Sequence, residues 1–159
     1  IFYYIGQYST TLGSAGVVFE ITNGGINGKM ISVEETKCKW RDEAIETNAV
    51  NLDDGMANMN TIKAINPDLS KYPAFRWCAD YGTDWYLPAL NELKTIYNNK
   101  STIKSILSAY GYTSFETSYY WSSTQPSNSI IAHCLNFSSG ALYHDGKDYS
   151  HYVRAVLAF

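Results

Sequence analysis

The chain of 159 residues has the length of about one domain and is long enough to bury a hydrophobic core without disulfide or metal staples. Charged residues make up 17% and aromatic residues 15% of the sequence, a balance that excludes a disordered chain. The net charge of −3, with no run of Lys or Arg, argues against nucleic-acid binding, and no apolar stretch approaches the roughly 20 residues needed to insert across a membrane.

The first third of the chain is predicted to form a β-hairpin. Short apolar runs at 16–19 and 29–33 flank a segment at 23–28 that is rich in Gly and Asn, which tolerate the positive φ angles of tight turns. Two apolar runs separated by such a turn are typical of paired antiparallel strands.

The middle third has the apolar spacing of four helices. Capping or helix-breaking residues delimit them: Asp53 or Asp54 and Asn66-Pro67 for the first, Pro73 and Gly82 for the second, Pro88 before the third, and Ser101 and Gly111 for the fourth. Their inward faces are predicted to be Met59, Ile62 and Ile65; Ala74, Trp77, Cys78 and Tyr81; Leu90, Leu93, Ile96 and Tyr97; and Ile103, Ile106, Leu107 and Tyr110.

The last third, 117–159, lacks a helical period and is predicted to form strands. The segments 119–123 and 152–157 are rich in aromatic and β-branched residues, and Leu135 and Phe137 are two apart, so both can face inward on one strand. Strands, then helices, then strands predict an α+β fold with one antiparallel sheet. Because no repeat or linker interrupts the chain, we expect residues 1–159 to form a single domain.

The chain begins at Ile1 without Met or a signal-type segment, so a targeting segment is expected to lie outside it. Its three cysteines, Cys38, Cys78 and Cys134, cannot form a fully paired framework. A Cys38–Cys78 bridge and three free thiols both remain open.

Three stretches carry a resemblance to a known family: WCADY at 77–81 with DWYLPALNEL at 84–93, YWSST at 120–124, and VRAV at 153–156. In this order they resemble the DUF1566 / Lcl C-terminal group of C-type-lectin-like domains. More closely, the chain is similar to the variable proteins of diversity-generating retroelements from gut Bacteroides and their phages.

The resemblance implies a C-type-lectin-like fold, with an antiparallel sheet, helices from the middle segment and a C-terminal variable region at 117–159. In such systems a reverse transcriptase misincorporates at template adenines. Randomising the first two bases of AAC codons reaches every residue type except Met, Trp, Lys, Glu and Gln.

The composition of residues 127–152 agrees with that pattern. Only Lys147 among these 26 residues is of an unreachable type, whereas the other 133 residues contain 24. The segment also holds five Ser, three Tyr and all three His, the kind of composition that antibody paratopes use. A polar strand-and-loop surface that is poor in Lys and Glu for ordinary reasons is the alternative.

The variable region is therefore divided into framework and display residues. The framework set is Trp121, Ala132, Leu135, Phe137, Gly140, Val153, Ala155 and Val156. The candidate ligand-binding set is Ser127, Asn128, Ser129, Ile130, Ile131, His133, Cys134, Asn136, Ser138, Ser139, Ala141, Leu142, Tyr143, His144, Asp145, Asp148, Tyr149, Ser150, His151 and Tyr152.

Within this set, Tyr143, His144, Tyr149 and Tyr152 are the expected binding anchors. Ile131 is also open to the alternative that it begins a strand and belongs to the core. By resemblance, Lys147 and Arg154 belong to the framework. Arg154 is expected to bond a carboxylate of the middle segment, such as Asp84 or Glu92.

Metal binding is not expected. The segment Gln125-Pro126-Ser127 matches a calcium-dependent lectin motif only in part, and Asp53-Asp54 is more simply a helix cap than a cation site. The residues His133, His144, His151, Cys134 and Asp145 lack the spacing typical of zinc ligands.

The chain is not expected to be an enzyme or to need a cofactor. By resemblance the fold is shared with formylglycine-generating enzymes, but no Cys pair near the C-terminus matches theirs, and no Gly-x-Ser-x-Gly elbow is present.

We expect a ligand-binding display protein, located outside the cell, at its surface or on a phage particle. Its partner would be a protein or glycan on another cell or phage surface. The alternative is a constant adhesin or pilus-tip module of the same fold.

Overall fold

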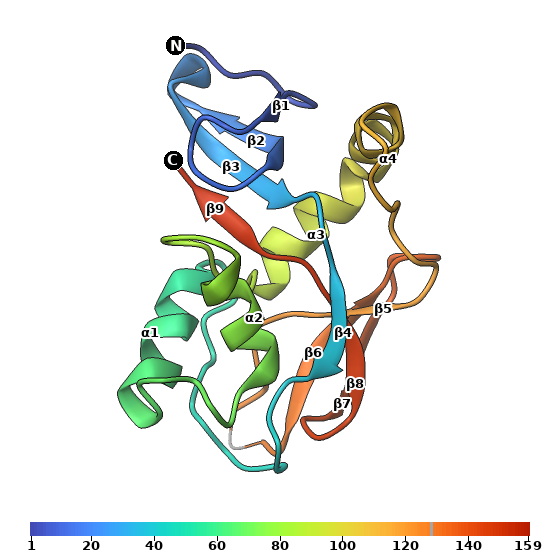
Figure 1. The fold of residues 1–159 in the computed structure, drawn as a ribbon. Coiled ribbons are helices and arrows are strands. Elements are labelled where there is room, and N and C mark those ends of the chain that lie inside the picture. The colour runs from blue at the N-terminus through green and yellow to red at the C-terminus, as the bar shows by residue number, and fades with distance from the viewer. Residues whose placement is uncertain (128) are drawn as a thin grey trace.

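A computed structural model describes residues 1–127 and 129–159. These residues form four helices and two sheets, in strand orders β1-β2-β3-β9 and β4-β8-β5-β6-β7, which confirms the α+β class (Figure 1). The strands are β1 (Tyr8–Ser9), β2 (Gly16–Thr22), β3 (Asn27–Ser32), β4 (Thr36–Lys39), β5 (Tyr119–Trp121), β6 (Ile131–Asn136), β7 (Leu142–Gly146), β8 (Ser150–Val153) and β9 (Val156–Ala158). The α-helices are α1 (Gly55–Ile65), α2 (Pro73–Tyr81), α3 (Leu90–Asn98) and α4 (Lys100–Ala109).

The N-terminal hairpin forms where it was predicted. Strands β2 and β3 pair antiparallel around a short 3-10 turn at Asn23–Gly25. Gly25 has a φ of +91°, and a Cβ there would lie 2.5 Å from the carbonyl oxygen of Tyr3, so this turn requires glycine.

The expectation of one antiparallel sheet is wrong. The predicted strand at 152–157 is divided: β8 belongs to the five-stranded sheet and β9 to the four-stranded sheet, with Arg154 and Ala155 between them. In addition, β8 lies parallel to β5. A run of residues that passes from one sheet to another has the same alternation as a single strand, so the sequence pattern does not reveal the division.

The helices follow the predicted signals with small differences. Asp54 caps α1, because its side chain accepts hydrogen bonds from the backbone N–H groups of Met56 and Ala57. Helix α4 begins at Lys100 rather than after Ser101. Ile65 and Tyr110 are exposed rather than inward, because each lies at or just past the end of its helix.

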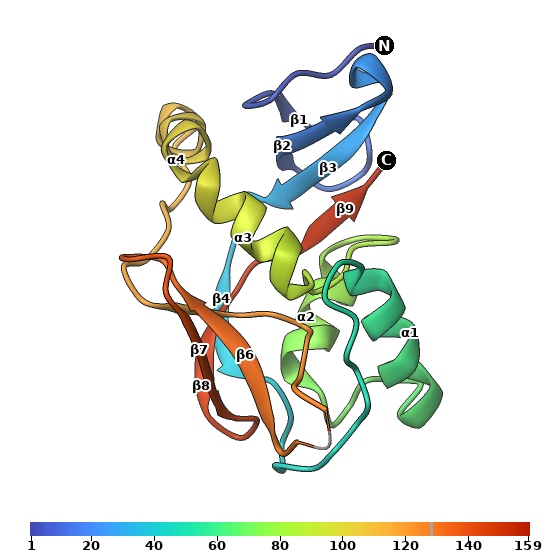
Figure 2. The ribbon, with the colours of Figure 1, turned by 180° about the vertical axis from the view of Figure 1, so that it is seen from behind.

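Helix α3 lies between the two sheets and connects them. Helix α3 packs against β2 of one sheet and β6 of the other, and Figure 2 shows it lying between them. One hydrophobic cluster includes buried residues from both sheets and all four helices. This core provides a rigid frame for the C-terminal strands and loops.

Two further expectations concern the whole chain. None of the helices in the described parts of the chain is long and apolar enough to cross a membrane. Cys38, Cys78 and Cys134 are free thiols, which decides between the two alternatives left open for Cys38 and Cys78.

Candidate ligand-binding surface

The C-terminal strands place most of the predicted binding residues at one edge of the five-stranded sheet. Within residues 1–127 and 129–159, strand β7 lies at the end of the strand order and pairs with β6, and residues 147–149 join it to β8. In the turn between β6 and β7, the Asn136 side chain accepts hydrogen bonds from the backbone N–H groups of Ser138 and Ser139. This bonding fixes the turn while leaving both serines exposed.

Most predicted binding residues are accessible to some degree. The exposed ones, hereafter the display surface, are Ser127, Ile130, Ser138, Ser139, Ala141, Leu142, Tyr143, His144, Asp148, Tyr149 and Ser150. The half-buried ones are Ser129, Ile131, His133, Asn136, Asp145, His151 and Tyr152. Asn128 lies outside the described residues.

The display surface carries exposed apolar and aromatic side chains among small polar ones. Ile130, Leu142, Tyr143 and Tyr149 are each about half exposed, at 47–58%. The Tyr143 ring lies 5.1 Å from that of Tyr119 and 5.8 Å from the imidazole of His144. Exposed apolar side chains grouped with aromatic rings are typical of contact surfaces.

Cys134 does not belong to this surface, and its prediction as a display residue is wrong. It is fully buried, and its register places it between Trp121 of β5 and Tyr143 of β7. Because alternate residues of a strand share a face, Cys134 faces the same side as the buried Ala132. Burial raises the pKa of its thiol to about 12.

Tyr152 is a weaker candidate anchor than the other three. It is half-buried, its ring packs 5.5 Å from that of Tyr120, and the ammonium of Lys37 lies 5.3 Å from it. These contacts assign much of the Tyr152 side chain to the sheet itself.

The predicted framework residues are buried as expected, apart from the half-buried Gly140. Gly140 lies in the β6–β7 turn with a φ of +75°, and a Cβ there would lie 2.5 Å from the ring of Tyr97. The framework residues of the C-terminal region therefore lie in the interior, whereas the described display residues range from exposed through half-buried to the fully buried Cys134.

Lys147 is buried directly beneath the loops of the display surface. Its Nζ donates hydrogen bonds to the Ile45 carbonyl at 2.7 Å, to Gln125 Oε1 at 2.6 Å and to the Ser129 carbonyl at 3.1 Å. The same ammonium lies 4.6 Å from the centre of the Trp40 ring. Burial lowers the pKa of Lys147 to about 8. One side chain therefore ties three loops together.

Replacing Lys147 with methionine should lower the free energy of unfolding by about 1–3 kcal/mol, because three acceptors in two other loops lose this donor. Equilibrium urea unfolding measures the change. The control is Lys39→Met, since Lys39 is exposed and its replacement should cost about 0.5 kcal/mol or less. Equal stability of the Lys147 and Lys39 variants would contradict the role of Lys147 as a clamp.

His151 and Asp145 contact each other beneath the display surface. His151 Nε2 lies 3.0 Å from Asp145 Oδ2, which links β8 to β7, and the imidazole packs edge-on at 4.6 Å from Trp121. Burial lowers the pKa of His151, although the hydrogen bond to Asp145 opposes that shift. This pair supports the sheet more than it offers contacts to a ligand.

The expectation that Arg154 bonds a middle-segment carboxylate such as Asp84 or Glu92 is wrong. Its guanidinium bonds Glu35, with Nη2 and Nε at 2.7 and 2.8 Å from Oε1. Glu35 directly precedes β4, whose first residue, Thr36, pairs with Val153 of β8. The pairing of β4 with β8 therefore brings the two charged residues together.

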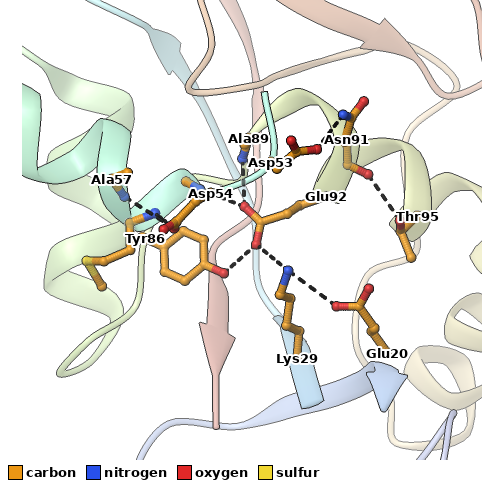
Figure 3. Close-up of polar contacts among 12 residues, drawn as sticks. Glu20, Lys29, Asp53, Asp54, Ala57, Tyr86, Ala89, Asn91, Glu92 and Thr95 are labelled. Carbon is orange, nitrogen blue, oxygen red and sulfur yellow. Dashed lines mark hydrogen bonds and ion pairs between the residues drawn. The ribbon is translucent and has the colours of Figure 1, made fainter. Parts of the chain in front are cut away.

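A concave region separate from the display surface lies between α1, α3 and the four-stranded sheet (Figure 3). It is a cavity of about 480 Å³ that is lined by Lys29, Asp53, Asp54, Met56, Asp84, Tyr86, Glu92 and Ala158. Three of its four acids have partners: Asp54 caps α1, Asp53 accepts a hydrogen bond from Asn91, and Glu92 pairs with Lys29 (Figure 3). Within 1–127 and 129–159, no group of three or more His, Cys, Asp or Glu residues could hold a metal ion. The cavity is thus a structural junction.

Sequence reasoning missed two residues at the margin of the display surface. Tyr119 is half-buried and contacts Tyr143, and Ile45 is an exposed side chain in a loop that Lys147 holds beside Ser129. The sequence placed Tyr119 in a strand but did not show which face of the sheet it occupies. The register of β5, β6 and β7 is needed to identify its neighbours. No sequence signal points to Ile45, because its proximity depends on a contact 102 residues away.

Comparison with known proteins supports this fold. A family model described as the Lcl C-terminal domain matches residues 29–157. Among solved structures, a fimbrial protein from Bacteroides ovatus resembles the chain with a TM-score of 0.66 and 16% sequence identity. The match covers 83% of this chain and 36% of that protein, so the chain spans about a third of that protein's length. No match among curated proteins was found.

Proposed function

The chain belongs to the Lcl C-terminal domain family, whose fold is C-type-lectin-like, and we propose that it is a binding module displayed at a cell surface. Its display surface would recognise a protein or glycan on another cell or on a phage. The observation that carries this proposal is the exposure of Ile130, Leu142, Tyr143 and Tyr149 on strands and loops whose frame includes the buried, hydrogen-bonded Lys147.

The physical properties of the surface favour recognition without catalysis. Tyr side chains provide a large amphipathic contact area at small entropic cost, and Ser side chains adapt their hydrogen bonds to different partners. The thiols are unsuited to the cysteine chemistry of formylglycine-generating enzymes, since burial raises the pKa values of Cys38 and Cys134 to about 12. We therefore assign no catalytic residue.

We further propose that the display surface is diversified by a retroelement. Lys147, the single residue of an unreachable type in 127–152, is fully buried and belongs to the framework. Every exposed residue of the described display surface is of a type that adenine randomisation of AAC codons reaches. A neighbouring template repeat that differs at adenines, together with a reverse transcriptase gene, is the expected genomic finding.

The second candidate is a constant adhesin with one fixed ligand. The likeness in fold to a fimbrial protein favours it, because a fimbrial module needs no diversification. An unvarying display surface among closely related strains, with no template repeat nearby, would support the constant adhesin and contradict diversification.

Binding should depend on the exposed tyrosines. On an array of glycans and cell-surface proteins, Tyr149→Ala and Tyr143→Ala should each weaken binding to the recognised ligand by about tenfold or more, as truncated aromatic anchors commonly do. The control is Tyr4→Ala, which removes a tyrosine of the N-terminal segment that is more exposed than either. Equal affinity of the wild type and both display variants would remove this surface as the binding site.

A further inference from the structure

The β6–β7 hairpin brings two histidines together that lie eleven positions apart in the sequence. His133 of β6 is directly opposite His144 of β7. The backbone N–H of His133 donates to the Thr124 carbonyl, and its own carbonyl accepts from the Ser122 N–H, so both groups point away from β7. The two histidines thus form a non-hydrogen-bonded cross-strand pair, the arrangement in which opposing side chains are closest.

Residues opposite each other in such a pair project from the same face of the sheet, with Cβ atoms about 4.5–5.5 Å apart. Two imidazoles at this separation can reach one ion between them. The hairpin fixes the backbone positions of His133 and His144. The entropic cost of bringing the two metal-binding side chains together is therefore met when the domain folds.

Both imidazoles are without competing partners. Within the parts of the chain that the structure describes, neither His133 nor His144 forms a side-chain hydrogen bond or an ion pair, and Nδ1 of His133 is buried without a partner. His144 is exposed, and His133 is half-buried. The third histidine, His151, differs because its Nε2 is already bonded to Asp145.

We propose that His133 and His144 together bind one divalent transition-metal ion, with Cu²⁺ preferred. Neutral imidazole is a good ligand for Cu²⁺, Ni²⁺ and Zn²⁺, and Cu²⁺ binds most tightly in the general order of divalent affinities. A structural zinc site normally has four protein ligands, which this pair does not supply. Water completes the coordination, and these open positions lie beside the exposed side of His144.

Positive charge near His133 limits the affinity of this site for a metal ion. The positive charge of Lys94 on α3 acts on His133 and opposes a second positive charge there. The bound ion adds a Lewis-acid contact at the display surface, which suits ligands with carboxylate or other oxygen donors. This site does not depend on diversification or on the tyrosine anchors.

The test is a titration of the intact chain with Cu²⁺ alone, followed by calorimetry and electron paramagnetic resonance. The wild type should bind one Cu²⁺ with two coordinated imidazole nitrogens. His144→Ala and His133→Ala should each weaken binding at least tenfold, and His151→Gln, the matched control, should leave it unchanged. Thermal unfolding checks that each variant is folded, and His144 is exposed, so that variant stays informative.

Three results would overturn the proposal. These are unchanged Cu²⁺ affinity in either His133→Ala or His144→Ala, a spectrum with a single imidazole nitrogen, or equal loss in His151→Gln. The two proposals can fail separately. If the chain binds Cu²⁺ as proposed but Tyr149→Ala does not weaken binding to array ligands, the metal site stands and the proposed role of the tyrosine in ligand binding fails.

Discussion

Replacing Arg154 with methionine should lower the free energy of unfolding by about 3–5 kcal/mol, the range found when one partner of a buried ion pair is removed. The guanidinium is buried and bonds Glu35 as well as three backbone carbonyls. Nη1 donates to the carbonyls of Ser32 and Val33 at 3.0 and 3.1 Å, and Nη2 donates to that of Thr113 at 2.8 Å. Methionine fills much of the volume and satisfies none of these acceptors.

The position of Arg154 makes the loss larger than that of an ordinary ion pair. It lies between β8 and β9, and so holds the point where the chain passes from one sheet to the other. The carbonyls that it bonds belong to two segments, namely the last residue of β3 with the residue that follows it, and the segment after α4. Without the guanidinium, buried acceptors in both segments are left unpaired.

Urea unfolding measures the loss, and two further variants define its origin. Arg76→Met removes an exposed arginine whose i,i+4 pair with Asp80 spans 3.6 Å, and it should cost less than about 1 kcal/mol. Adding Glu35→Leu to Arg154→Met should cost less than the sum of the two single changes, because it also removes the uncompensated carboxylate. A loss below about 1 kcal/mol in Arg154→Met would show that the buried network is dispensable.

The second large effect is expected at Glu92, whose replacement with alanine should also cost about 3–5 kcal/mol. One carboxylate oxygen accepts hydrogen bonds from the N–H groups of Gly55 and Ala89 at 2.8 and 3.0 Å. The other accepts from the Tyr86 hydroxyl at 2.5 Å and pairs with Lys29 at 3.0 Å (Figure 3). Alanine leaves all four donors without this acceptor.

The energetic role of Glu92 follows from its place at a junction. Its four partners come from the start of α1, the segment before α3, and β3. One side chain therefore joins α1 and the segment before α3 to the four-stranded sheet. Burial and the neighbouring Glu92 raise the pKa of Tyr86, which keeps its hydroxyl a donor well above neutral pH.

The free energy of unfolding of Glu92→Gln should lie between those of the wild type and Glu92→Ala. An amide oxygen still accepts from Gly55 and Ala89, but it no longer balances the charge of Lys29. Glu20→Gln is the control, since Glu20 contacts the same lysine at 3.3 Å but is about one-third exposed. Its loss should be below about 1 kcal/mol. Thermal and urea unfolding measure all three variants, and a cost at Glu92 no greater than at Glu20 would contradict the junction.

Much of the fold could be predicted from local sequence. The Gly and Asn residues at 23–28 predicted the hairpin, and Asp54 and Pro73 marked the starts of α1 and α2. These signals work because a turn or a cap depends on residues that are near each other in the chain. The errors at Ile65 and Tyr110 arose at helix ends, where helical periodicity continues past the residues that reach the core.

The candidate site could be predicted only in part. Alternation correctly placed Leu135 and Phe137 inside, but it was not applied from Ala132 to Cys134, which shares a face with Ala132 and is also buried. The spacing of His133 and His144 carries no metal signal along the chain, since their proximity depends on the register of β6 against β7. Zinc-ligand spacing detects sites within a loop or helix and overlooks cross-strand pairs.

The sequence by itself determined the α+β class, the four helices, the N-terminal hairpin and the exposure of eleven of the twenty predicted display residues, because each depends on turn chemistry, helical spacing or composition over a few residues. Only the tertiary structure decided that the final strand divides between two sheets, that Arg154 bonds Glu35, and that Lys147 bonds the loop of Ile45. Those contacts join residues 102 and 119 positions apart, and a buried charge takes whichever partners the packed core places around it.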